Sequence, residues 1–392
     1  MTSPIPYYHN AALSSETPTI SIRRTPQTSV IKIALGIVGL LIAMLLGLLV
    51  LLIIGIETGP VAFLMGLIAA TIPVPIYVIL VLWIDRYEAE PFWMLATAFL
   101  WGALVATFFA FLLNTTGGQV VKALAGEAAG NTFAIVISAP IVEETGKAAI
   151  LFLFYFLKKD EFDGVIDGIV YAALVALGFA MTENILYYGK SALGGGAQLT
   201  VTIILRGAMA PFSHPLFTSM TGIGLGLARQ SNKLAVKLIT PVIGLLMAIF
   251  MHSIWNGSAA IGGGAVFLLT YILVMVPAFI VLLIVIGIAL YREGQVVRQF
   301  LLCDLERGHL TPEEYRRLGS VFGRMGSSFS ALSQHGVKGW RTRRRFHQTV
   351  SELAFHRCRV ARGWRPSALD VRELEAAYLF TLQGLGKEMS VR

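Results

Sequence analysis

Charged residues are scarce in this chain of 392 residues: Asp, Glu, Lys and Arg make up only 14%, whereas 56% of the residues are hydrophobic. The mean hydropathy is +0.71. A soluble core does not need so much apolar sequence. The composition therefore excludes an ordinary soluble enzyme and is typical of a polytopic membrane protein.

Cysteine is also scarce, and the two that are present, Cys303 and Cys358, both lie near the C-terminal end. This placement argues against a disulfide-stapled extracellular domain and favours two free thiols on a reducing cytosolic face. Common nucleophile and nucleotide motifs are missing as well. The sequence has no G-x-S-x-G elbow on a membrane serine, no cysteine in an apolar run, no H-E-x-x-H and no phosphate-binding glycine loop.

Eight apolar runs are long enough, at about 20 residues, to cross a bilayer as helices. They cover residues 31–56, 60–84, 92–114, 132–157, 164–188, 199–227, 235–256 and 265–290. The sequence therefore predicts an all-α fold, a polytopic membrane helix bundle of about eight transmembrane helices with a short helical cytoplasmic tail. The first run is longer than a signal-peptide core, so we expect an anchor rather than a cleaved leader.

Composition divides the chain into a disordered polar arm (1–29), a transmembrane domain (30–291) and a basic tail (292–392). The tail holds 18 Lys and Arg against 10 Asp and Glu, whereas the rest holds 13 of each. Basic residues between the apolar runs gather on one side, which predicts a multi-pass cell-membrane protein with both termini cytoplasmic. The protein as a whole is expected to contact the lipid bilayer. The cluster at residues 340–345 of the tail could touch anionic lipid or nucleic acid, but such a tail is usually only solvated or associated with the membrane surface, and we expect no nucleic acid.

Two adjacent glutamates, Glu143 and Glu144, lie near the middle of the fourth apolar run. An ionisable group at that depth costs several kcal/mol unless it faces a partner or a polar cavity, which makes it a functional-site hypothesis. Lys147 lies one turn further on and can pair with either carboxylate. The alternative is a buried ion pair that only fixes helix packing, but two acids for one base leave one carboxylate over.

Four later polar residues fall inside the other apolar runs: Glu183, His214, His252 and Asn256. Taken singly, Glu183 could reach the membrane surface and each histidine could be a packing residue. His252 and Asn256, however, are i and i+4 on one helix face, and Arg206 lies at a depth where it can pair with Glu183. Pro211 and Pro215 should break or kink the helix beside His214. Together these features predict a water-filled polar site inside the membrane.

Such a site suits hydrolysis of an acyl bond. A buried glutamate can act as a general base on water, and imidazole and amide groups can stabilise the oxyanion of a tetrahedral intermediate. Because the sequence shows no serine or cysteine nucleophile motif, we expect water to be the nucleophile.

At these residues the chain resembles the PrsW-type intramembrane proteases, which are related to the glutamate-dependent CAAX-processing and bacteriocin-processing membrane proteases. The resemblance extends over about residues 60–260 and lies in motifs that follow one another along the chain. These are E-E-x-x-K (Glu143, Glu144, Lys147), F-x-x-x-E (Phe179, Glu183), a membrane histidine (His214), H-x-x-x-N (His252, Asn256), the segment Asp85 to Pro91 and the Phe162-Asp163-Gly164 segment.

The resemblance implies a peptidase that cuts a membrane-anchored protein, such as an anti-sigma factor, within or next to the membrane. It makes Glu143 or Glu144 the water-activating base, assisted by Glu183. His214 and His252 would position water or stabilise the oxyanion, and Asn256 would donate a hydrogen bond. It also implies a zinc set of Glu183, His214 and His252 with an open position, although a base-only mechanism needs no metal.

Two other functions fit the same residues. Membrane carboxylates and histidines also build the proton relays of coupled transporters, but the eight runs show no clear internal repeat. A catalytically silent scaffold that binds partners through its tail would not need the complete polar set.

Overall fold

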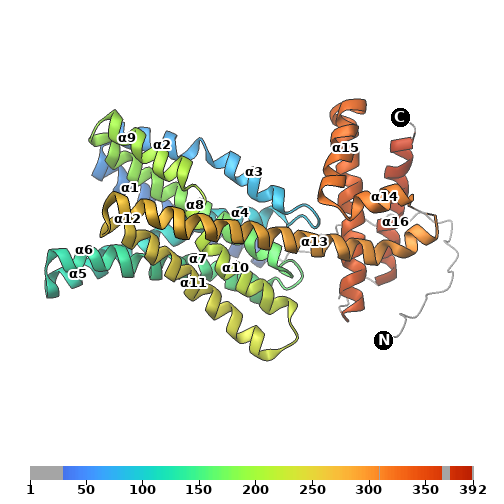
Figure 1. Cartoon of the computed structure of the whole chain (residues 1–392), viewed down its shortest axis with the longest axis horizontal. Helices are drawn as coiled ribbons and strands as arrows, with labels where there is room; N and C mark the ends of the chain where they lie inside the picture. Colours follow the sequence, from blue (N-terminus) through green and yellow to red (C-terminus); the bar gives the residue numbers. More distant parts are fainter. Residues whose placement is uncertain (1–29, 309, 364–370, 391–392) are drawn as a thin grey trace.

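A computed structural model describes residues 30–308, 310–363 and 371–390 (Figure 1). The arm expected at 1–29 lies outside the described residues. Helices are the only regular secondary structure in the described part of the chain, in agreement with the all-α prediction.

The transmembrane part begins with α1 (Val30–Thr58), followed by α2 (Pro60–Thr71) and α3 (Val74–Ile84), which Pro73 separates. The next two helical arms each contain a π-helical stretch. The first is α4 (Phe92–Leu100), η1 (Trp101–Ala106) and α5 (Thr107–Ala125), and the second is α6 (Glu127–Phe133), η2 (Ala134–Ser138) and α7 (Ala139–Leu157).

The remaining arms enclose or follow the central helix α8 (Val165–Leu193). They are α9 (Gly196–Ile203), η3 (Ile204–Met209) and α10 (Ser213–Gln230); α11 (Leu234–Ala260); and α12 (Gly263–Thr270), η4 (Tyr271–Met275) and α13 (Val276–Glu306). The chain leaves the helix at residues 210–212, so the break predicted beside His214 is confirmed.

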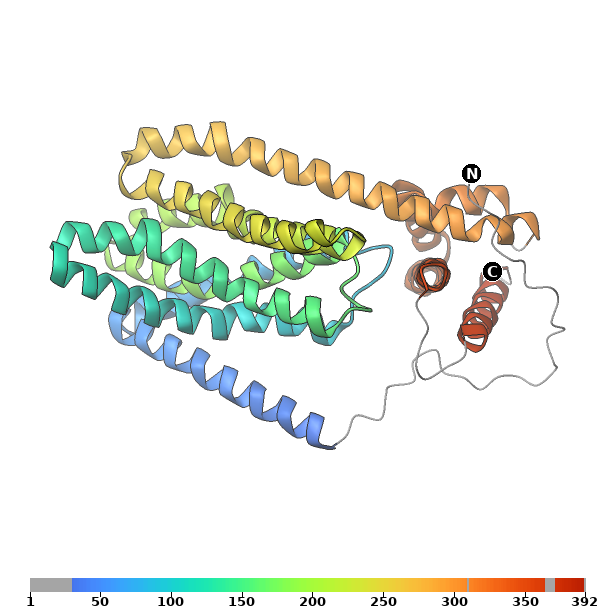
Figure 2. The same ribbon diagram turned by 90° about the horizontal axis from the view of Figure 1, so that it is seen from below.

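Six helical segments in the described residues are long and apolar enough to cross a membrane. The two other predicted spans, 132–157 and 199–227, are also helical and run inside the same bundle (Figures 1 and 2). The first of these arms carries Glu143, Glu144 and Lys147, which lower its hydropathy, and the second is interrupted at residues 210–212. The chain is therefore a polytopic helical membrane protein with six spans defined by hydropathy.

Helix α8 forms the centre of the bundle. Of its most apolar stretch 94% is buried, compared with 39% or less in the other five segments. Glycines let neighbouring backbones approach it: a Cβ at Gly102 would lie 1.9 Å from the Val175 carbonyl oxygen, and one at Gly168 would lie 2.2 Å from that of Gly222. Close contact through small residues is typical of helix packing in membranes.

The tail consists of helices that continue directly from the last span, because α13 runs through the expected boundary at 291 without interruption. It comprises α14 (Pro312–Leu318), α15 (Val321–Ala361) and α16 (Val371–Ser390). Thr311 caps α14 by accepting the Glu314 amide N–H, as Thr-Pro-Glu-Glu predicts. Gly336, with φ 64°, divides α15 into two helices.

These tail helices pack at one end of the bundle, and the N-terminal end of α1 points to the same end (Figure 2). Arg324 donates to the Arg86 carbonyl oxygen at 3.2 Å, and Arg359 pairs with Glu88 at 2.5 Å. Both cysteines are free thiols, Cys303 exposed and Cys358 buried. The side of the membrane that the tail occupies stays a prediction.

Candidate active site

Glu144 is the most fully bonded carboxylate of the site and is completely buried. Its Oε1 lies 2.8 Å from Lys147 Nζ and 3.0 Å from His252 Nδ1, and its Oε2 accepts the Thr218 hydroxyl at 2.8 Å. Buried polar groups are stable only when they are hydrogen-bonded. Glu144 therefore acts as the hub that fixes α7, α10 and α11 to one another.

Glu143, the adjacent residue, is placed differently. Its Oε2 atom is buried and makes no hydrogen bond to any described residue, although it lies 3.7 Å from Lys147 Nζ and 3.9 Å from His252 Nε2. The side chains of adjacent helical residues point in directions about 100° apart. Only one of the two glutamates can therefore hydrogen-bond directly to Lys147 and its neighbours. Glu143 is left with a carboxylate oxygen available to a water molecule, a metal ion or a substrate.

Lys147 is also fully buried and lies among all these groups. Its Nζ is 3.1 Å from His214 Nδ1 and 4.0 Å from the centre of the Phe179 ring. Because the ammonium group can only donate, His214 Nδ1 must be the acceptor in this contact. The proton of neutral His214 then resides on Nε2.

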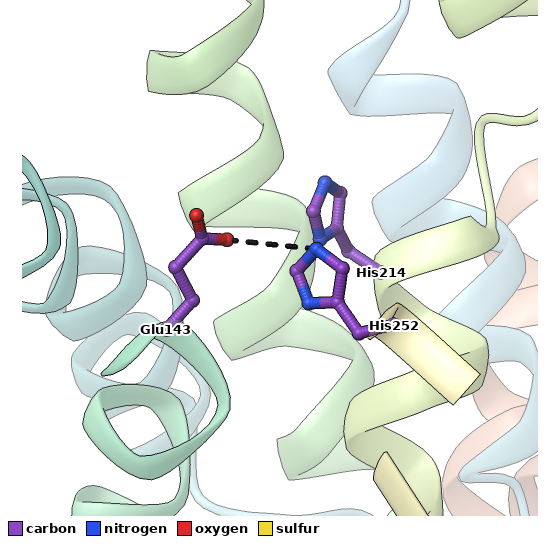
Figure 3. Close-up of side chains that lie close together, drawn as sticks. All are labelled: Glu143, His214 and His252. Atoms are coloured by element: carbon purple, nitrogen blue, oxygen red, sulfur yellow. Dashed lines mark ion pairs between the residues drawn. The ribbon is translucent and has the colours of Figure 1, made fainter. Parts of the chain in front are cut away.

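The two histidines face each other and Glu143 across the interior of the bundle (Figure 3). Their ring centres are 5.1 Å apart, and both side chains are buried. His214 is the second residue of α10, directly after the break at 210–212. His252 comes from the second half of α11, and its ring stacks on that of Phe217 with the ring centres 5.1 Å apart. The Nδ1–H of His252 points to Glu144, which leaves Nε2 directed toward Glu143.

Glu183 closes the least buried side of the site. Its Oε2 accepts from Arg206 and lies 3.0 Å from His214 Nε2, so the pairing expected for Arg206 and Glu183 is present. Arg206 also donates to Asn184 Oδ1 at 2.6 Å. The side chains of Glu183 and Arg206 are 18% and 24% exposed, compared with 7% or less for the other charged groups of the site.

Asn256 lies away from these groups. Its Nδ2 donates to the Ile135 carbonyl oxygen at 3.0 Å, in the π-helical stretch η2 that precedes α7. Among the described residues, Asn256 makes no hydrogen bond to the carboxylates or imidazoles of the site, although we expected one. It lies on the same helix face as His252, but one turn further from Glu143. Asn256 thus ties α11 to the backbone of η2, which leads directly into α7.

Sequence reasoning missed Thr218 and the contact of Phe179 with Lys147. His214 and Thr218 are i and i+4, and this spacing places both on the face of α10 that meets Glu144. That signal was available in the sequence, whereas the identity of the helix they face was not.

A metal ion has a suitable set of ligands here. Glu143, His214 and His252 each offer one ligand atom, and these atoms lie within 4.8 Å of one another. The set resembles the expected two-histidine, one-carboxylate zinc site, with Glu143 in place of Glu183 because Arg206 already neutralises Glu183. Glu144 bonded to His252 Nδ1 matches the carboxylate that usually orients a ligating imidazole. Lys147 lies beside the same atoms and would compete with a cation.

The fold and the site together define a class: a polytopic helical membrane protein whose buried polar centre combines carboxylates and imidazoles. Comparison with known proteins specifies the class further. Residues 90–282 match the model of the PrsW family of intramembrane metalloproteases. No solved structure matches the chain.

Three curated relatives, each called Protease PrsW, are similar to this chain. The Geobacillus kaustophilus protein is 35% identical over 174 residues, which is 44% of this chain and 69% of the relative. The Oceanobacillus iheyensis protein is 30% identical over 52% of this chain and 83% of the relative, and the Bacillus subtilis protein is 31% identical over 44% and 72%. The chain belongs to the PrsW family of intramembrane metalloproteases, and it is a peptidase.

Proposed function

We propose that this peptidase hydrolyses a peptide bond in or next to the membrane segment of a membrane-anchored protein, with a water molecule that Glu143 activates. The observation that carries the proposal is the buried Oε2 of Glu143, which has no hydrogen-bond partner in the described part of the chain, whereas both oxygens of the adjacent Glu144 are bonded. A desolvated carboxylate without a partner is an unfavourable arrangement unless it binds water or substrate.

In this mechanism the attacking water lies between Glu143 Oε2 and His252 Nε2, which are 3.9 Å apart. Glu143 takes a proton as the water oxygen attacks the scissile carbonyl carbon, while the second water proton points to the lone pair of His252. Glu144 fixes this orientation through its bond to His252 Nδ1.

The oxyanion of the tetrahedral intermediate needs a hydrogen-bond donor from the protein, because bulk water is excluded from the site. Two N–H groups of Lys147 point to Glu144 and His214, and the third is free to point toward Glu143 and the reacting carbonyl. Glu143 then gives its proton to the leaving nitrogen as the carbon–nitrogen bond breaks. Glu183 assists by holding His214 in place.

Zinc, if bound, would be held by Glu143, His214 and His252 and would polarise the attacking water there. Lys147 would have to move away from His214 to admit it, because both approach the same ring. Metal analysis of the purified protein distinguishes these two mechanisms. About one zinc ion bound per chain supports the metal site, and a value far below one supports the base-only mechanism.

The substrate class follows from the depth of the site. We propose a protein with one membrane span, and an anti-sigma factor is the first class to test because family resemblance implies it. Entry is proposed at the Glu183–Arg206 side, where the charged groups are least buried.

The test compares cells that express the wild type, Glu143→Gln or Glu144→Gln at matched levels, with new protein N-termini measured by mass spectrometry of the membrane fraction. Glu143→Gln keeps the size of the side chain and removes the base, so we expect the new termini to disappear while folded protein remains. Glu127→Gln, on an exposed residue paired only with Lys122, is the matched control and should cleave normally.

Undiminished cleavage by Glu143→Gln would refute its role as the base. If wild-type and variant cells show the same termini under envelope stress as well, the proposed cleavage of a membrane-anchored protein by the Glu143 site fails.

A further inference from the structure

We propose that the second half of α15 is a lipid-binding surface, on which four cations hold the anionic phospholipid headgroups of the bilayer that contains the protein. We call these four residues the basic face. They are Lys338, Arg341, Arg344 and Arg345.

The basic face is a property of one helix. At about 100° per residue its four members fall within an arc of about 120°. All four are exposed, whereas Phe346, Val350 and Leu353 on the opposite side are buried against the rest of the tail. The helix is thus fixed by its apolar side and presents only its cationic side outward.

These charges are not neutralised within the described part of the chain. Arg343, which lies between them in sequence, points elsewhere and has Glu314 3.7 Å away. None of the four members of the basic face has a carboxylate within ion-pair distance in the described residues, and Arg344 instead lies over the ring of Trp340 at 4.9 Å. Four exposed cations without an ion-pair partner on one face are available to bind an external anion.

The basic face lies at the level of the membrane boundary. Trp83 and Arg86 mark the end of α3, with the guanidinium group 4.1 Å from the ring centre, and Lys158 lies over Trp93 at 4.9 Å at the same end. Tryptophan is enriched where a bilayer meets water. Arg324, in the first half of α15, bonds the Arg86 carbonyl oxygen and so anchors the tail at this level.

The direction of α15 agrees with this position. Figure 1 shows it running across the end of the bundle rather than along it, so its length follows the membrane surface. Burial lowers the pKa of the Arg86 guanidinium, and the positive charge of nearby Arg344 lowers it further. The basic face therefore begins next to the residue that ends a membrane span, where headgroup phosphates lie.

The proposal is tested with the full chain in nanodiscs of phosphatidylcholine alone or mixed with phosphatidylglycerol, by hydrogen–deuterium exchange of residues 337–348. We expect exchange to be slower by about twofold or more with phosphatidylglycerol, because headgroups restrain local opening of the helix. Added salt should reverse the effect, since exposed charges are screened.

Two variants with the same loss of charge make the test specific. Lys338→Gln, Arg341→Gln, Arg344→Gln and Arg345→Gln together should abolish the lipid-dependent protection. The control changes four exposed cations elsewhere, Lys159→Gln, Lys233→Gln, Lys237→Gln and Arg316→Gln, and should retain it.

Equal exchange in both lipids, or an equal loss in the control variant, would overturn the proposal. Protection produced by added RNA but not by phosphatidylglycerol would also overturn it, and would assign the basic face to nucleic acid. None of these outcomes depends on proteolysis, so the proposal stands or falls separately from the mechanism.

Discussion

At the scale of single residues, two neighbouring glutamates have different surroundings. Glu144 is bonded on both oxygens, whereas Glu143 keeps one oxygen free in a buried place. The sequence predicted the pair and its lysine, and helical geometry predicted that they diverge. It could not predict which glutamate is free, because that depends on α10 and α11, which are distant in sequence.

Thr218 gives a residue-scale prediction. Its hydroxyl bonds Glu144 Oε2 at 2.8 Å, so Thr218→Ala leaves a buried carboxylate oxygen unsatisfied. Such a loss costs about 1–3 kcal/mol of stability. We expect a lower unfolding temperature in detergent and slower cleavage of a model substrate, while Thr218→Ser restores both. Equal behaviour of the alanine and serine variants would show that the hydroxyl does not support Glu144.

At the scale of elements, the break between η3 and α10 is held by tyrosines from other helices. Tyr77 of α3 donates to the Gly207 carbonyl oxygen, and Tyr271 of η4 donates to that of Met209 at 2.9 Å. Proline chemistry predicted the break. The two tyrosine contacts were not predictable from local sequence, since each joins residues more than sixty positions apart.

Removing one of these ties tests their role. Tyr271→Phe keeps the ring and frees the Met209 carbonyl, for a cost of about 1 kcal/mol. Because the same segment carries Arg206 and leads into His214, we expect slower substrate cleavage with only a small fall in unfolding temperature. Tyr291→Phe is the control, since this tyrosine is exposed. If both variants cleave equally, the tie at Met209 does not position the site.

At the scale of the whole molecule, composition predicted the membrane class and the helical tail. The prediction of eight spans rested on length. It included two arms that hydropathy alone does not define, because the first carries three charged residues of the site and the second is broken at residues 210–212. The docking of the tail on the loop of residues 85–91 was not predictable. It depends on Arg324 and Arg359, which lie more than two hundred residues further along the chain.

Asp85, in the loop of residues 85–91, should make the stability of the folded protein depend on pH. Burial raises the pKa of Asp85 from 3.8 to about 7, against the opposing hydrogen bond from the Glu90 amide. The folded protein therefore binds a proton more tightly than the unfolded chain, so this contribution is complete below pH 4 and is lost as pH rises through about 7. We expect the unfolding temperature in detergent to fall over this interval.

Asp85→Asn should flatten that part of the profile, because the amide oxygen still accepts the Glu90 N–H but carries no charge at any pH. An unchanged profile in Asp85→Asn would assign the pH dependence to other groups of the loop.

Helix α13 joins the last span to the tail without a hinge. Its 31 residues extend about 46 Å, so a change of about 10° in the tilt of the span displaces its far end by about 8 Å. Tilt responds to bilayer thickness. The helix thus acts as a mechanical lever. A thinner or thicker membrane would by itself strain the contact of Arg359 with Glu88, with no ligand needed.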